Sequence, residues 1–451
     1  MPSDLLATFV RVLEGVCRPA LTRPSFSNML VLVVGWIVTQ APLRAVTEVL
    51  VATGVAGRRH HEAFHRFFSR GTWSPDEIGY FLLRRLEALI DQGPLRLAID
   101  DTLAPKKGPH VFGLGVHLDP VRSTRKHRIF AFGHCWVTLA VLVRLPFSRR
   151  TWALPVRFRL YRNVKDHEKE GTPYRKKTEL AREMLDAICR WFDGPVEVCA
   201  DAAYCNDTVM RSLPERVVFF GAMRPDAVLT AAPAARAKTG RPPKRGSVLP
   251  KPEQLANNAD VPWKSVKASL YGKLVDVRYK EICAQWYRAC GTRLLRIVVV
   301  ATPTGSLPLR VFFCTDPTRD VPTIVETYAC RWAIEVCFRD LKQVLGFADS
   351  TARARAAVLR VAPFVGLLYS VLVIWFAEGA WKSNLAIPPL RPWYPHKRDH
   401  SFSDILRAAR RMLQGADVLD PASDFMNLPK PWPRPGSRAG LGVKTRRRCA
   451  A

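Results

Sequence analysis

Four residues that could act on phosphate esters recur at helical spacing between positions 328 and 342. Tyr328, Arg331, Glu335 and Lys342 form the pattern Y-x2-R-x3-E-x6-K. At 100° per residue their offsets place all four on one helical stripe about 60° wide. The stripe presents a carboxylate between two fixed cations. An amphipathic surface helix with an Arg–Glu pair would show the same residues, so the stripe alone does not define a site.

The other side of this segment must pack if the stripe is to be held in place. It carries an apolar face suited to a core, after which Gly346 offers a helix stop. The apolar residues are Cys330, Ile334, Cys337, Leu341, Val344 and Leu345.

Two apolar segments upstream, Leu97–Asp101 and Val198–Asp201, are predicted strands that end in carboxylates. Carboxylates at strand ends, joined by a Glu from a packed helix, form a ligand set for two hard divalent cations. Two such ions about 4 Å apart can activate a water and stabilise a leaving 3′ oxygen in phosphodiester transfer. A single Asp at a strand end is commonly a turn or cap residue, so the interpretation depends on all three carboxylates.

The first strand leaves its ligand undecided between Asp100 and Asp101. Alternation places Asp100 on the face of Ala98, and Asp101 on the face of Leu97 and Ile99. Both faces of such a sheet can be covered, so parity does not choose between them.

Composition points to a polyanionic partner. The chain has 451 residues, 48% of them hydrophobic, and 69 Lys+Arg against 39 Asp+Glu give a net charge of +30. Nucleic acid is the usual partner for such an excess, with a membrane surface as the second choice. Eleven cysteines without a C-x2-C pair or Cys/His ligand spacing indicate reduced thiols of a cytoplasmic protein. The apolar runs Met29–Val38 and Val361–Ala377 are interpreted as buried core helices, so we expect a soluble protein.

The chain divides into five predicted segments. Residues 1–90 form a helical DNA-binding domain, for which a helical cap with a solvated basic face is the alternative. Residues 91–224 alternate strands and helices, which indicates an α/β fold. Residues 225–320 form a basic linker and a mostly antiparallel β-rich insertion. Residues 321–385 contain the Glu335 helix and further helices, and 386–451 form a C-terminal helical and loose basic tail.

The basic linker contains Thr239–Gly246, an Arg-Pro segment flanked by glycines and basic residues. It is similar to an AT-hook, which lies in the minor groove of DNA, and a plain basic loop along phosphates fits it equally well. Its DNA-binding candidates are Arg241, Lys244 and Arg245.

The Tyr328–Lys342 signature resembles that of bacterial insertion-sequence DDE transposases, in the cut-and-paste, hairpin-forming branch. The strand end Asp101-Thr102 with Lys106-Lys107-Gly108 resembles the first-aspartate segment of that family. The resemblance covers roughly residues 90–350 and extends to the order of the elements. Its specific part is the Y-R-E-K spacing.

The resemblance implies an RNase H-like catalytic domain in which Asp101, Asp201 and Glu335 hold two Mg²⁺ ions, with Mn²⁺ as a substitute. Asp101 is chosen because the family places its ligand before Thr, and Asp100 is the fallback.

DNA contacts are implied as well. Tyr328, Arg331 and Lys342 would bind phosphates near the transposon end. A base flipped from a hairpin could stack on Trp332, although a buried structural Trp is the expected role for that residue.

The predicted function is therefore cleavage of transposon ends and strand transfer into target DNA. The expected partners are double-stranded DNA and a second copy of the chain on paired ends, with no membrane and no small-molecule substrate, and the expected location is a bacterial nucleoid in the cytoplasm. The alternatives are a stand-alone metal-dependent nuclease and a catalytically inactive DNA-binding regulator. The basic N-terminal module and the insertion count against the first, and the three carboxylates count against the second.

Overall fold

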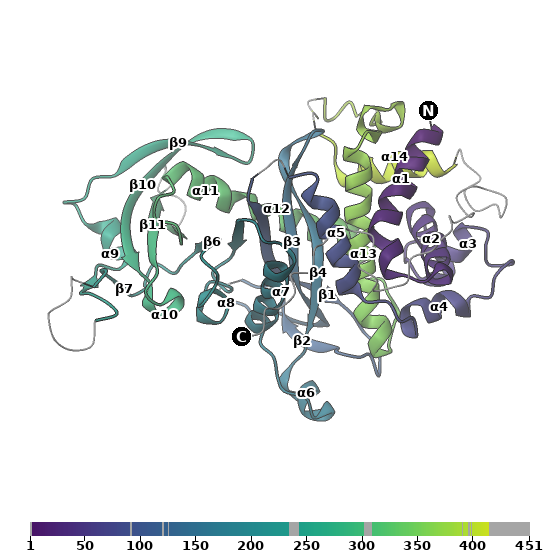
Figure 1. Ribbon diagram of the computed structural model, residues 1–451, viewed down its shortest axis with the longest axis horizontal. Helices are drawn as coiled ribbons and strands as arrows, with labels where there is room; N and C mark the ends of the chain where they lie inside the picture. Colours follow the sequence, from purple (N-terminus) through teal and green to yellow (C-terminus); the bar gives the residue numbers. More distant parts are fainter. Residues whose placement is uncertain are drawn as a thin grey trace, which may run out of the picture. The chain divides into compact units, whose positions relative to one another are not determined.

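The computed structural model describes residues 2–90, 93–119, 121–124, 126–233, 243–301, 309–389, 391–395, 397 and 399–414. They divide into two compact units, one comprising residues 1–86, 108–112 and 340–451, the other residues 87–107 and 113–339. The first unit is helical, and the second contains the β-sheet (Figure 1).

The second unit is organised around one mixed sheet, 12-stranded in the described residues. The strand order is β2-β3-β1-β5-β6-β12-β11-β10-β7-β8, with β4 paired to β3 and β9 paired to β10. The α/β class predicted from the sequence is therefore confirmed. The strands are β1 (Leu95–Pro105), β2 (Gly115–Leu118), β3 (Phe130–Leu145), β4 (Ser148–Tyr161), β5 (Val196–Ala200), β6 (Val217–Ala222), β7 (Leu229–Thr230), β8 (Val248–Leu249), β9 (Lys264–Leu270), β10 (Lys273–Gln285), β11 (Leu294–Ala301) and β12 (Arg310–Cys314).

The N-terminal half of this sheet has the order and directions expected of an RNase H-like domain. β1 pairs antiparallel with β3, and β3 with β4, whereas β5 and β6 run parallel to β1. Helix α7 (Lys177–Trp191) connects β4 to β5 after the short α6 (Val164–Glu170), and α8 (Asp207–Met210) precedes β6. A crossover of this kind is what a parallel pair requires.

The predicted insertion does not form a separate sheet. β12 pairs antiparallel with β6 through Phe313↔Gly221, so the inserted strands extend the catalytic sheet. Without this pairing β6 would leave an open edge. The β9–β10 hairpin turns at Tyr271-Gly272, both at positive φ as a two-residue turn requires. The sequence also predicts a strand over Ile282–Ala289. Instead, β10 continues to Gln285 and α10 (Tyr287–Cys290) follows, while α9 (Pro252–Asn257) precedes β9.

The first unit packs N-terminal helices against C-terminal ones. Trp375 of α13 donates its indole N–H to the Leu5 carbonyl of α1 (2.9 Å), and Arg360 of α13 donates to the Phe68 carbonyl of α4 (2.8 Å). The elements are α1 (Pro2–Cys17), η1 (Arg18–Ala20), α2 (Arg23–Val38), α3 (Val46–Ala52), α4 (Glu62–Ser69), α5 (Pro75–Glu87), α13 (Arg355–Ala377), η2 (Ala380–Lys382), η3 (Asn384–Ala386) and α14 (Phe402–Gln414).

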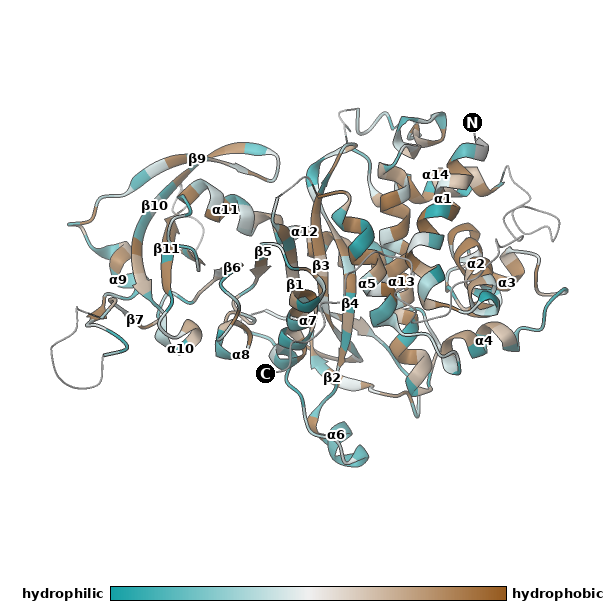
Figure 2. Cartoon of the chain, in the orientation of Figure 1, coloured by the Kyte–Doolittle hydropathy of each residue, from teal (hydrophilic) through white to brown (hydrophobic). Residues whose placement is uncertain are grey.

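The apolar runs explain why this unit joins both ends of the chain. α13 is hydrophobic along its length, as its brown colour in Figure 2 shows. It is buried on every side from Val361 to Phe376, apart from Pro363. Such a helix needs cover on every side. α1, α4 and α14 contact it, so the predicted boundaries at residues 90 and 386 separate helices that pack together. Among the described residues, one helix, α13, is long and apolar enough to cross a membrane. In its most apolar stretch of 18 residues, 83% is buried inside the protein.

Candidate active site

The register of two parallel strands brings two aspartates to one place. β1 and β5 pair in parallel up to Ile99↔Ala200, so the next residues, Asp100 and Asp201, follow at equivalent positions. Side chains at equivalent positions of neighbouring parallel strands point to the same face, and the residue after each points to the other. Asp201 lies one residue beyond the end of β5, and its negative charge raises the pKa of Asp100, so the two carboxylates lie close together. Asp101 points to the other face of β1, where it meets Lys177.

Arg331 connects this face to Glu335. One guanidinium nitrogen of Arg331 donates to Asp100 Oδ2 (2.9 Å) and the other to Glu335 Oε1 (2.7 Å). Arg331 and Asp100 are mostly buried, and Glu335 is about one third exposed. Because both hydrogen bonds are charge-assisted, they fix the orientation of two carboxylates that come from distant parts of the chain.

The signature segment is not the single helix assumed from its spacing. α11 (Val321–Cys330) ends and α12 (Trp332–Gln343) begins on either side of Arg331. The amides of Arg331 and Ile334 each bond the carbonyl three residues earlier, which tightens the junction into a 3₁₀-like turn. The backbone of Arg331 stays in the right-handed helical region (φ −53°, ψ −34°), so the chain continues through this turn, and Arg331 and Glu335 face each other.

The apolar side of α12 is buried as predicted. Ile334, Cys337, Leu341 and Leu345 are at most 1% exposed, and Gly346 at φ 67° follows as the helix stop. Cys330 and Val344 are only half-buried.

Tyr328 packs beside the arginine. Its ring lies 4.6 Å from the Phe312 ring of β12, and the Arg331 guanidinium carbon lies 5.8 Å from the Tyr328 centroid. Burial raises the pKa of the Tyr328 hydroxyl, and Asp201 raises it further. Tyr328 therefore remains a neutral hydroxyl beside the two aspartates at neutral pH.

The electrostatics of Asp100 reflect crowding of negative charge. Burial raises its pKa to about 7, with Asp201 adding to the rise and Arg331 opposing it. Divalent cations prefer carboxylate oxygens, and a bound cation would relieve this repulsion, so the donor set fits such an ion. Among the described residues, however, no three His, Cys, Asp or Glu side chains are grouped closely enough to hold one. Arg331 donates to both Asp100 and Glu335 and so occupies the space between them.

Asp101, the first-choice ligand, has different neighbours. Its carboxylate accepts hydrogen bonds from Lys177 of α7 (2.6 Å) and from the Tyr204 hydroxyl (2.7 Å). α7 and the α11–α12 segment therefore lie on opposite faces of the sheet at β1. The structure brings the fallback residue Asp100, and not Asp101, to Arg331 and Glu335.

The remaining candidates are distributed as follows. Trp332 is 50% exposed, so the expectation of a buried structural Trp is wrong. Lys342 lies on α12 two turns beyond Glu335 and is half-buried. Lys244 and Arg245 are exposed, with Arg245 over the Tyr287 ring of α10, and Arg241 lies outside the described residues.

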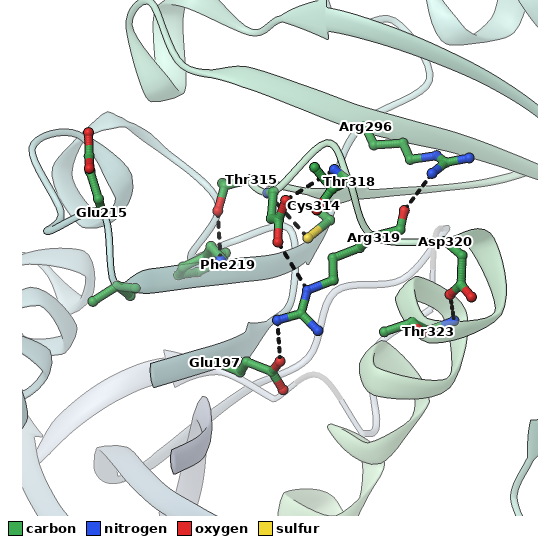
Figure 3. Close-up of polar contacts among 12 residues, drawn as sticks. Glu197, Glu215, Phe219, Arg296, Cys314, Thr315, Thr318, Arg319, Asp320 and Thr323 are labelled. Carbon is green, nitrogen blue, oxygen red and sulfur yellow. Dashed lines mark hydrogen bonds and ion pairs between the residues drawn. The ribbon is translucent and has the colours of Figure 1, made fainter. Parts of the chain in front are cut away.

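Sequence reasoning missed the polar network that sets the start of α11 (Figure 3). Buried Glu197 on β5 pairs with Arg319 (3.1 Å) and with Arg96 of β1 (2.7 Å). Asp320 caps α11 by accepting from the Thr323 amide (2.8 Å). The capping signal, an Asp before Val-Pro-Thr, is visible in the sequence, but the partnership with Glu197 depends on strand register.

The fold is α/β, with Asp100 in the middle of β1 and Asp201 directly after the adjacent parallel strand β5. Arg331 links Asp100 to Glu335 on α12. Residues 18–279 match the family described as DDE superfamily endonuclease. This is more than half of the chain, and the chain belongs to that family. The match includes both aspartate segments and ends before Tyr328.

No curated protein matches the sequence. Among solved structures, the chain is similar to the cryo-EM structure of piggyBac transposase in a synaptic complex with hairpin DNA, with 10% identity and a TM-score of 0.42. That alignment covers 94% of this chain and 83% of the other.

Proposed function

We propose that this protein is a DNA transposase that cleaves the ends of an insertion-sequence element and joins them to target DNA by cut-and-paste. The observation that carries the proposal is the parallel register that sets Asp100 beside Asp201 on the face where Arg331 and Glu335 meet. Membership of an endonuclease family supports phosphodiester chemistry. A stand-alone nuclease and an inactive DNA-binding regulator are the outcomes that the experiment below must separate.

In this proposal Asp100, Asp201 and Glu335 are the metal ligands, and Asp100 replaces the sequence-based choice of Asp101. Mg²⁺, or Mn²⁺ in its place, would supply Lewis-acid activation of the attacking and leaving oxygens. Arg331 neutralises Asp100 and Glu335 when no cation is bound, which keeps the buried carboxylates in place. Arg331 must release at least one of them for the ligand set to form, so it is also placed to turn toward a DNA phosphate.

The DNA-facing roles follow from exposure and charge. Trp332 presents half of its surface next to Arg331, where an unstacked base from a hairpin end could stack on it. Tyr328, Arg331 and Lys342 are proposed to contact phosphates near the element end. Lys244 and Arg245, with Arg241, are proposed to contact flanking duplex. Two chains on paired ends would bring both cuts together, in the nucleoid of a bacterial cytoplasm.

The test uses the purified full chain, Mg²⁺ and a labelled duplex carrying the element end that flanks the gene. Wild type is compared with Glu335→Gln and with Glu326→Gln as a matched control, since Glu326 on α11 binds the Ser269 amide and not the site. The proposal expects nicking, hairpin formation and joined product from wild type and from Glu326→Gln alone. Cleavage without joining would indicate a nuclease. Tight binding without cleavage by any of the three would indicate the regulator.

A further inference from the structure

Asp101 is held by donors from three separate elements. Its Oδ2 accepts from Lys177 Nζ of α7 (2.6 Å) and from the Cys135 thiol of β3 (3.3 Å), and its Oδ1 accepts from the Tyr204 hydroxyl (2.7 Å). Both carboxylate oxygens are therefore engaged by the protein. Because the Asp101 side chain is held at both oxygens, it can in turn hold the groups that donate to it in fixed positions.

The donor from Tyr204 comes from the turn that carries Asp201. The Tyr204 amide donates to the Asp201 carbonyl (3.1 Å), and the Ala203 amide donates to Asp201 Oδ1 (2.9 Å). The Tyr204 side chain is almost completely buried, at 1% exposure. Because one tight turn includes both residues, the place of the Tyr204 hydroxyl constrains the direction of the Asp201 carboxylate.

Asp101 also acts on Asp100 from the other side of the strand. Its backbone amide donates to Asp100 Oδ1 (2.8 Å). A single residue thus contacts Asp100 through its main chain and the Asp201 turn through its side chain. Loss of the side-chain contact would remove the hydrogen bond that joins the Asp201 turn to the side chain of Asp101.

We propose that Asp101 is a positioning residue that, through Tyr204, holds the Asp201 turn against β1 so that Asp201 and Asp100 stay close together, where the proposed cation would bind. Lys177 holds the other carboxylate oxygen of Asp101 through a charge-assisted hydrogen bond (2.6 Å). The inference rests on the proposed function, because it assumes that Asp100 and Asp201 bind a divalent cation. It assigns to Asp101 a role that does not require contact with that cation.

The experiment measures Mn²⁺ affinity of the full chain by titration calorimetry, together with cleavage of the element end over a range of Mn²⁺ concentrations. Tyr204→Phe removes only the hydroxyl, and Asp101→Asn keeps the shape while removing the charge. Tyr161→Phe is the matched control, since the Tyr161 hydroxyl bonds Tyr174 on the same side of the sheet without contacting Asp101. Loss of a partner that orients a metal ligand typically weakens metal binding about 10- to 100-fold.

The expected result is a weakening of Mn²⁺ binding of that size in Tyr204→Phe and Asp101→Asn, with cleavage recovered at saturating Mn²⁺. Tyr161→Phe should match wild type. Unchanged Mn²⁺ affinity in a folded Tyr204→Phe protein, or cleavage that no Mn²⁺ concentration restores, would overturn the positioning role. Asp100→Asn tests the premise that Asp100 binds the cation. If this variant binds Mn²⁺ as wild type does, the cation site is elsewhere, and both the proposed ligand set and the positioning role of Asp101 fail.

Discussion

At the scale of single residues, neighbouring aspartates on one strand have separate environments. Asp100 faces Arg331 and the equivalent position on β5, whereas Asp101 faces α7. Consecutive side chains on a strand point to opposite sides, so only one of the two can share the Asp201 face. The chemistry expected of each therefore differs, although the residue type is the same.

Asp100→Asn is expected to abolish cleavage at every Mn²⁺ concentration, because it removes a charge that a divalent ligand set needs. The loss should exceed the roughly 100-fold upper range for outer partners of metal ligands. Single-turnover cleavage of a labelled element end measures it. Asp101→Asn, tested alongside, should recover at high Mn²⁺, and equal, unrescuable losses in both variants would contradict the assignment.

Trp332→Ala should affect DNA handling and leave the fold intact. Half of the side chain is buried, so its truncation should lower the free energy of unfolding by about 2 kcal/mol, less than for a fully buried Trp. Loss of a stacked base should weaken binding to a hairpin-ended duplex by about 1–3 kcal/mol. Anisotropy titrations measure the binding, and Trp332→Tyr, which retains a stacking ring, should lie near wild type. A folded Trp332→Ala protein with unchanged hairpin binding would contradict this.

At the scale of elements, the site depends on how helix ends are anchored to strands. Asp320 caps the start of α11 by accepting from the Thr323 amide. The preceding residue, Arg319, pairs with buried Glu197 on β5. At its other end α11 gives way to α12 at Arg331, so the position of the arginine follows from where α11 starts. The β12–α11 loop thereby transmits the geometry of the sheet to the signature residues.

Glu197→Ala should destabilise the sheet unit by about 1–3 kcal/mol, because it leaves two arginines without their shared buried acceptor. The loss stays in this low range because Arg96 and Arg319 are each about one third exposed and can reach water. Urea unfolding followed by tryptophan fluorescence measures it. Asp226→Ala, which breaks the exposed Arg224–Asp226 pair, is the control and should cost almost nothing. A comparable loss in the two variants would argue against a special role for Glu197.

Asp404 on helix α14, in the helical unit, should make the stability of the protein depend on pH. Burial opposes ionisation of Asp404, but hydrogen bonds from Lys397 and Ser401 outweigh it and hold the pKa of Asp404 well below its usual value. A depressed carboxyl pKa contributes stability that is complete above the unfolded value, near pH 4, and is lost as the pH falls below it.

Asp404→Asn should therefore be less stable than wild type by about 3 kcal/mol at pH 7, where it leaves buried cations unpaired. The difference between the two proteins should shrink as the pH is lowered from 5 toward 3. Thermal unfolding across this range tests it, with Asp226→Asn as an exposed control. A difference that stays constant with pH would show that Asp404 is not the titrating group.

At the scale of the whole molecule, the net charge of +30 is the dominant property. It favours association with a polyanion through release of counterions, largely without regard to base sequence. Exposed groups such as Lys244 and Arg245 are expected to contribute to this general attraction, and the buried Arg331 is not. Affinity for DNA and competence for cleavage should thus be separable.

Affinity for random duplex DNA should fall by about a thousandfold between 50 and 200 mM salt, as for proteins that make several phosphate contacts. Fluorescence anisotropy at a series of salt concentrations gives the slope. Glu335→Gln should have the same slope as wild type, since it leaves the exposed cations in place. A variant that carries both Lys244→Ala and Arg245→Ala should have a shallower salt dependence of affinity. An unchanged slope would mean that the phosphate contacts are made by other residues.

Much of this protein could be predicted from local patterns. Strands β1, β3, β4, β5 and β6, helix α7 and the buried side of α12 follow from hydrophobic periodicity and length, because burial imposes a period of two or 3.6 residues on the sequence. The helix stop at Gly346 follows from its tolerance of positive φ. The candidate residues Glu335 and Asp201 follow from residue type and position at the ends of such elements.

Tertiary structure alone decided the rest, because each remaining question concerned partners far apart in the chain. β1 is buried on both faces, so the choice between Asp100 and Asp101 required knowing which face α11 and α12 cover. The break at Arg331 and the exposure of Trp332 depend on packing that periodicity does not encode. The sequence by itself determined which side chains could do the chemistry. Strand register and helix placement determined which of them meet.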